Sequence, residues 1–184
     1  MKKHMPPFLL AAWPYLLLVL LLSLTPILEE AGESAQYDLL VTCLSVAFQL
    51  FMAALFIGNA VYALRSKQLT ALELARWDFI IKLCHIPVYV LLFLFALLML
   101  IAIAVPAVLM MVIVMIPMIF LFDLVLMLTS SCYGFRALRM AKQEGLVDKK
   151  WARRHMIAHC FFVADVISAF LVWRRLKKET QSRA

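Results

Sequence analysis

The chain has 184 residues, of which 66% are hydrophobic and only 16% are charged, and its mean hydropathy is +0.96. Soluble domains have roughly 45 to 50% apolar residues, so this composition excludes an ordinary soluble domain. The net charge of +7 does not indicate nucleic-acid binding. The basic residues lie in short segments beside hydrophobic runs, as membrane topology signals do. We therefore expect an all-α integral membrane protein.

Five hydrophobic segments are long enough to cross a hydrocarbon layer about 30 Å thick at about 1.5 Å per helical residue. The first segment follows a basic head, but its apolar core is too long for a cleavable signal peptide, so we expect it to be retained. An acidic loop, residues 29–38, comes next. The predicted spans are Phe8 to Leu28, Leu39 to Leu64, Phe79 to Val105, a fourth from Ala107 and a last from Trp151 to Lys178.

Local signals mark two helix ends in this chain. Thr70 and Glu73 have the spacing of a capping box, which predicts that a short interfacial helix begins there. Gly145 follows a long apolar and basic run and is expected to end the fourth helix.

The orientation follows from the positions of the basic residues. With a cytoplasmic N-terminus, 13 of the 18 Lys and Arg residues lie on the inner side, which favours this orientation. The remaining five follow the last predicted span and would lie outside. A re-entrant or in-plane last helix would avoid that conflict. Apolar residues nevertheless surround this helix on most of its circumference, so we predict that it spans the membrane. The protein is then a multi-pass protein of the cell (inner) membrane, with its C-terminus outside.

An offset of 74 residues reveals a candidate internal repeat. It pairs Trp77 with Trp151, His85 with His159, and Gln49 with Asp123. This predicts a leading helix (1–36) followed by two parallel-repeat helical hairpins (37–110 and 111–184). Alternatively, two hairpins with basic inner loops share Trp and Arg through topology alone. The histidine match is harder to explain in that way.

Polar residues inside the predicted spans indicate where function resides, because such residues are costly in a membrane. His85 and His159 form an inner layer, and Gln49, Asp123 and Asp165 lie near the midplane. Buried His and Asp groups are the usual components of proton relays. The sequence therefore predicts a transporter, a permease subunit or an ion- or proton-conducting module for a small solute. The predicted path consists of Gln49, Asn59, His85, Asp123, His159, Asp165 and Ser168.

His155 and His159 have the spacing His-x-x-x-His, which places both on one helical face. This pair resembles the last-helix histidines of the hemolysin III and progestin-receptor-like membrane hydrolases. The resemblance implies a zinc site in which His85 supplies a third ligand and Asp123 a nearby carboxylate. It covers only residues 155–163, and that family has seven helices. A metal-dependent membrane hydrolase is therefore the alternative function, while an enzymatic activity, a metal and a cofactor are not the favoured expectation.

Two further resemblances concern short segments. Residues Cys84 to Pro87 and Phe162 to Ala169 resemble small, uncharacterised multi-pass membrane proteins of Gram-positive bacteria, which implies no activity. Val163 to Val166 is similar to the aspartate segment of lipoprotein signal peptidases. Asp123 lacks the Asn-x-x-Asp setting of the second carboxylate in those enzymes.

The remaining features of the sequence bear on partners. The four cysteines form no Cys-x-x-Cys pair, which argues against a thiol oxidoreductase. A non-catalytic accessory or immunity membrane protein is a further alternative. The expected partners are the lipid bilayer and either further copies of the chain or a larger membrane complex, with no role for nucleic acid.

Overall fold

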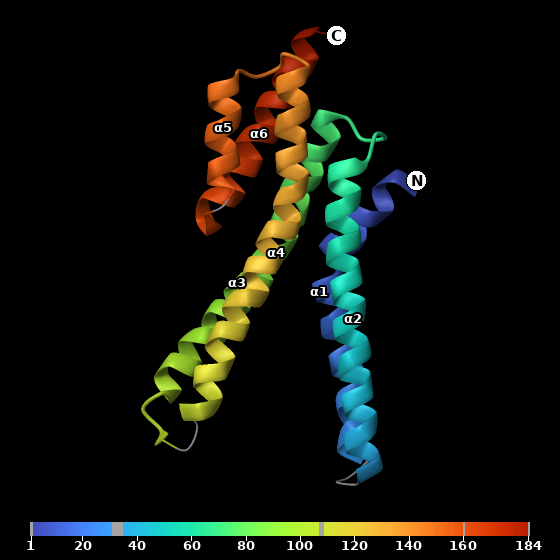
Figure 1. Ribbon diagram of the computed structural model, residues 1–184, viewed down its shortest axis with the longest axis vertical. Helices are drawn as coiled ribbons and strands as arrows, with labels where there is room; N and C mark the ends of the chain where they lie inside the picture. The colour runs from blue at the N-terminus through green and yellow to red at the C-terminus, as the bar shows by residue number, and fades with distance from the viewer. Residues whose placement is uncertain (1, 31–34, 107–108, 160, 184) are drawn as a thin grey trace.

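In the computed structural model, the described residues are 2–30, 35–106, 109–159 and 161–183, and within them the chain is helical with no strand (Figure 1). The all-α prediction is confirmed. The helices are η1 (Lys2–His4), α1 (Met5–Glu30), α2 (Ala35–Arg65), α3 (Ala71–Ala102), α4 (Leu109–Gln143), α5 (Lys149–Ala158) and α6 (Phe162–Arg183).

The four long helices run alternately up and down, with α1 beside α2 and α3 beside α4 (Figure 1). Both termini lie at the same end as the α2–α3 and α4–α5 connections. The Lys3 ammonium bonds to the Glu73 carboxylate at the start of α3, at 2.7 Å. The Arg183 guanidinium donates to the Gly145 carbonyl at 2.8 Å. We call this the basic end, because it gathers the Lys and Arg residues of segments 2–3, 65–76, 136–154 and 174–183.

Three helical segments in the described part of the chain are long and apolar enough to cross a membrane. They are Thr42–Arg65 within α2, α3 and α4. The predicted last span from Trp151 to Lys178 is wrong as a single helix, because α5 ends at Ala158 and α6 begins at Phe162.

Helices α5 and α6 instead form an antiparallel pair, which we call the C-terminal hairpin (residues 149–183). Arg175 lies over the Trp151 ring at 4.7 Å from its centroid. The His155 imidazole and the Ser168 hydroxyl are 2.8 Å apart. These contacts bring the end of α6 back to the start of α5. Both ends of the chain therefore lie at the same end of the bundle, whereas the predicted spanning last helix would separate them.

Side-chain chemistry explains the break. In one continuous helix, His159 and Asp165 would be about 9 Å apart along the axis and on different faces. The break lets their side chains approach to 2.6 Å. It also leaves the 74-residue repeat without structural support, because α3 is continuous where its predicted counterpart is broken.

The predicted helix ends are confirmed with one change. Thr70 and Glu73 form a reciprocal capping box, with Glu73 N donating to Thr70 Oγ1 at 3.2 Å and Thr70 N donating to Glu73 Oε2 at 2.9 Å. The box begins the long helix α3 rather than a separate interfacial helix. Gly145 follows the end of α4 with a φ of +67°, a conformation that glycine adopts at no steric cost.

The buried core lies towards the basic end. Leu74, Ile81, Leu138 and Leu176 from α3, α4 and α6 are fully buried there. The opposite halves of α3 and α4 instead carry exposed apolar side chains, including Leu98 and Met110. The C-terminal hairpin thus packs where the two long helices have polar residues to bury.

Candidate functional site

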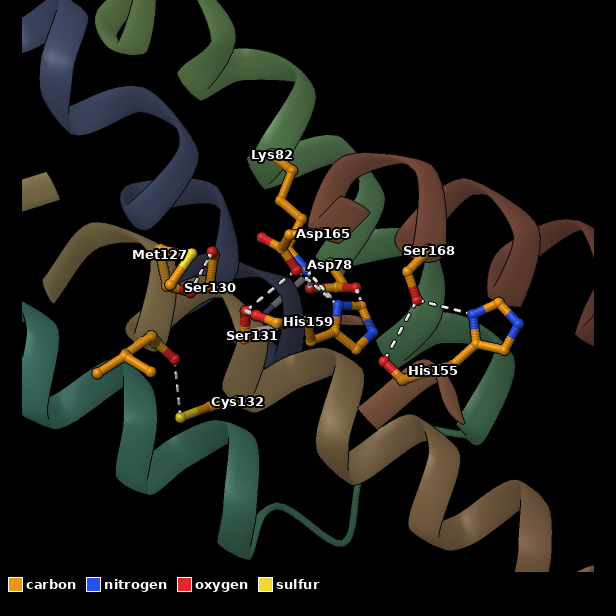
Figure 2. A network of polar contacts seen from close by, with 11 residues as sticks. Asp78, Lys82, Met127, Ser130, Ser131, Cys132, His155, His159, Asp165 and Ser168 are labelled. Carbon is orange, nitrogen blue, oxygen red and sulfur yellow. Dashed lines mark hydrogen bonds and ion pairs between the residues drawn. The ribbon is translucent and has the colours of Figure 1, made fainter. Parts of the chain in front are cut away.

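Five side chains from three parts of the chain meet inside the protein (Figure 2). Asp78 and Lys82 come from α3, Ser131 from α4, and His159 and Asp165 from the C-terminal hairpin. Each is at most 2% exposed. We call this set the buried network. A charged side chain this deeply buried is rare unless it is paired, so the network is the principal polar feature of the fold.

Lys82 lies between the two carboxylates. Its ammonium nitrogen is 2.8 Å from Asp78 Oδ1 and 2.5 Å from Asp165 Oδ1. Asp78 and Lys82 are four residues apart, so α3 presents them on one face. The contact with Asp165 joins α3 to the hairpin. This ammonium therefore offsets the cost of burying two carboxylates that are far apart in sequence.

His159 gives the network its distinctive chemistry. Its Nδ1 lies 2.6 Å from Asp165 Oδ1 and 2.8 Å from the Lys82 ammonium. A single imidazole nitrogen either carries a proton and donates, or lacks one and accepts. Nδ1 can thus donate to Asp165 or accept from Lys82, but not both at once. Each protonation arrangement of the ring satisfies a different neighbour.

The other side of the imidazole faces α3 and α4. His159 Nε2 is 3.8 Å from Asp78 Oδ2 and has no hydrogen-bond partner among the described residues. A Cβ atom at Gly134 would lie 2.7 Å from Nε2 and 2.8 Å from Asp78 Oδ2. Glycine therefore leaves the room that the ring occupies. The Ser131 hydroxyl completes the wall, 3.3 Å from Asp165 Oδ1 and 3.3 Å from the His159 carbonyl oxygen.

His155 lies one helical turn before His159, nearer the protein surface. Burial lowers the pKa of His155 below its ordinary value, and the charges of His159 and Arg175 act in the same direction. It lines a cavity of 490 Å³ at the basic end, together with Arg174, Arg175 and Lys178. A partly buried imidazole thus lines this cavity one helical turn away from His159 of the buried network.

The structure does not assemble the predicted histidine cluster. His155 pairs with Ser168. His85 is buried elsewhere and donates from Nε2 to the Leu10 carbonyl oxygen of α1, at 2.9 Å. The described residues contain no group of three His, Cys, Asp or Glu side chains that could hold a metal ion. Lys82, positively charged between the two carboxylates, opposes a cation at that position.

The other predicted path residues are dispersed. Gln49 is exposed on α2. Asn59 is buried and accepts a hydrogen bond from the Tyr133 hydroxyl at 2.9 Å. Asp123 lies in an apolar pocket beside the network. Of the predicted path residues, the structure brings His159 and Asp165 into the network.

Sequence reasoning missed three members of the network. Asp78 directly precedes the predicted span that begins at Phe79, Lys82 counts only among the 13 basic residues of the inner side, and Ser131 has no predicted role. The Asp-x-x-x-Lys spacing at the start of an apolar run was the available signal, because four residues place both charges on one helical face.

These features define an all-helical protein with three helices long and apolar enough to cross a membrane and with an ionisable network between α3 and a C-terminal hairpin. The chain belongs to a family of unknown function, DUF6652, whose model matches residues 5–178 and so includes the whole network. No curated protein and no solved structure matches it significantly.

Proposed function

We propose that the protein is a four-pass protein of the cell membrane, with α1 to α4 as the spans and the basic end in the cytoplasm. The positive-inside rule supports this orientation. The five Lys and Arg residues that a spanning last helix would place outside lie at the basic end, because α6 turns back towards it. The end of α1, which carries Glu29 and Glu30, and the start of α2, which carries Asp38, lie at the other end. Both termini would then be cytoplasmic.

We further infer that the protein is a small transporter, permease subunit or conducting module that handles protons, either alone or with a small solute. The observation that carries this proposal is the position of His159 Nδ1 between the Lys82 ammonium and the Asp165 carboxylate. Either neighbour can be satisfied, depending on where the proton lies. A site with two such arrangements is suited to accepting and releasing a proton.

The charge of the network supports the same function. Two carboxylates and one ammonium leave one net negative charge when the imidazole is neutral, and none when it is protonated. In a buried site this difference matters far more than in water. His155, one helical turn before His159, is a second titratable group and lines the surface cavity. Protonation of His159 would therefore change the electrostatics at the contact between α3 and the hairpin.

A non-catalytic accessory role is the second candidate. It is favoured by the full burial of the network, which ties the hairpin to the bundle whether or not protons move. This alternative predicts that the ion pairs contribute to stability without contributing to flux. The two functions differ in what happens when the protein is placed between compartments of different pH.

The test is proton flux into proteoliposomes that contain a trapped pH-sensitive dye, with a potassium diffusion potential as the driving force. Wild-type protein should conduct protons. Asp165→Asn should reduce the rate by about 10²-fold, because it removes a positioned proton acceptor. Asp165→Glu should restore much of the rate by returning the carboxylate.

Thr129→Val is the matched control for this experiment. The Thr129 hydroxyl is also buried, but it bonds to the Val125 carbonyl within α4, at 2.8 Å, and lies outside the network. The Thr129→Val protein should conduct protons at the wild-type rate. Equal flux through Asp165→Asn and wild type, with both correctly folded by gel filtration, would contradict the proposed function and favour the accessory role.

A further inference from the structure

An apolar pocket with one carboxylate lies beside the buried network. Its volume is 680 Å³, within the range of sites that hold drug-sized molecules. Helices α3 and α4 and the first turns of α6 form its walls. Most lining side chains are aliphatic or aromatic. The polar ones are Tyr89 and Asp123.

Asp123 is the unexplained group in this wall. Its Oδ1 is buried and has no hydrogen-bond partner among the described residues. A buried carboxylate oxygen without a partner is costly in apolar surroundings, and pairing with a cation offsets this cost. The chain has no Lys or Arg between residues 83 and 135. Lys82, just before that stretch, is already engaged with Asp78 and Asp165.

We propose that this pocket binds a hydrophobic organic cation, a compound with an apolar body and one ammonium or phosphonium centre. Asp123 would pair with the charge. Tyr89, Phe93 and Phe120 line the same pocket. The faces of aromatic rings attract cations. The aliphatic wall would receive the apolar body. One carboxylate among aromatic rings matches the charge, shape and polarity of such a ligand.

The pocket also adjoins the proton site. Val166 and Ile167 line it, and they directly follow Asp165 in the chain. A cation held there would make protonation of the network less favourable, and protonation of the network would weaken cation binding. The proposed binding of a cation does not depend on the proposed transport function. Only the assignment of this ligand as the transported solute depends on that function.

The binding test uses purified protein in phosphatidylcholine nanodiscs and two probes of similar size and shape, tetraphenylphosphonium and tetraphenylborate. The wild type should bind the cation saturably and should not bind the anion. Asp123→Asn should weaken cation binding by about tenfold or more, the effect of losing roughly 1.4 kcal/mol. Asp123→Glu should retain binding. Ile116→Trp, which fills the pocket and leaves the carboxylate, should abolish it.

Glu144→Gln serves as the control, since it removes an exposed carboxylate outside the pocket. Equal binding of both probes, or cation binding unchanged by Asp123→Asn and Ile116→Trp, would show partition into lipid only and would overturn the proposal. Specific binding in a protein that moves no protons would support this site while contradicting the proposed function. Proton flux without cation binding would overturn the site alone.

Discussion

Replacing Lys82 with methionine should destabilise the fold more than any other single change to the buried network. It would leave Asp78 and Asp165 buried with no cation between them. Removing one partner of a buried ion pair typically costs about 3 to 5 kcal/mol, because the remaining charge is uncompensated. The expected result is a large fall in the midpoint of thermal unfolding in detergent, measured by tryptophan fluorescence.

Two further variants make this prediction specific. Lys67→Met removes an exposed lysine at the basic end and should change stability by no more than about 0.5 kcal/mol. Combining Lys82→Met with Asp78→Asn and Asp165→Asn should recover part of the loss, since no uncompensated carboxylate then remains in the network. A Lys82→Met protein as stable as the wild type would mean that this ammonium does not hold the two carboxylates.

Gly134→Ala should displace the C-terminal hairpin from the bundle. The added methyl carbon would lie 2.7 Å from His159 Nε2 and 2.8 Å from Asp78 Oδ2, closer than real Cβ contacts allow. Overpacking of this kind typically costs about 1 to 3 kcal/mol. The ring would have to leave its position between Lys82 and Asp165. We expect lower thermal stability and faster hydrogen exchange in α5 and α6.

Gly58→Ala is the internal reference for that experiment. A Cβ atom at Gly58 would meet nothing within 4 Å. Alanine also favours a helix over glycine by about 0.8 to 1 kcal/mol, so this variant should be neutral or more stable. If both glycine variants behaved alike, the close packing of α4 against the hairpin would be contradicted.

Much of the helical framework could be predicted from the sequence. Long apolar segments gave the main helices, and the chemistry of Thr70 and Gly145 marked two of their ends. The break in the last helix could not be predicted in this way. Residues 159–161 are His, Cys and Phe, with no Gly or Pro, and residues 162–173 are mostly apolar. The break depends on tertiary contacts of His159 and Asp165, which no local pattern reports.

The candidate site was predictable only on its C-terminal side. His159 and Asp165 stood out as polar groups in an apolar run, which is a reliable signal of function. Counting depth along a continuous helix then placed them in separate layers, whereas the turn brings them together. Asp78 and Lys82 resembled ordinary residues of a helix start. Their role becomes visible only when the hairpin packs against α3.

The buried network depends most directly on the return of the chain between α5 and α6. Fusing either a fluorescent protein, which folds in the cytoplasm, or alkaline phosphatase, which is active outside, to the C-terminus tests it. Matching fusions in the connections at residues 66–70 and 103–108 calibrate the two sides. We predict that the C-terminal and 66–70 fusions both report the cytoplasm and that the 103–108 fusion reports the outside. Phosphatase activity at the C-terminus, with the other two sites as expected, would mean that the last segment crosses the membrane and would contradict the fold described for the buried network.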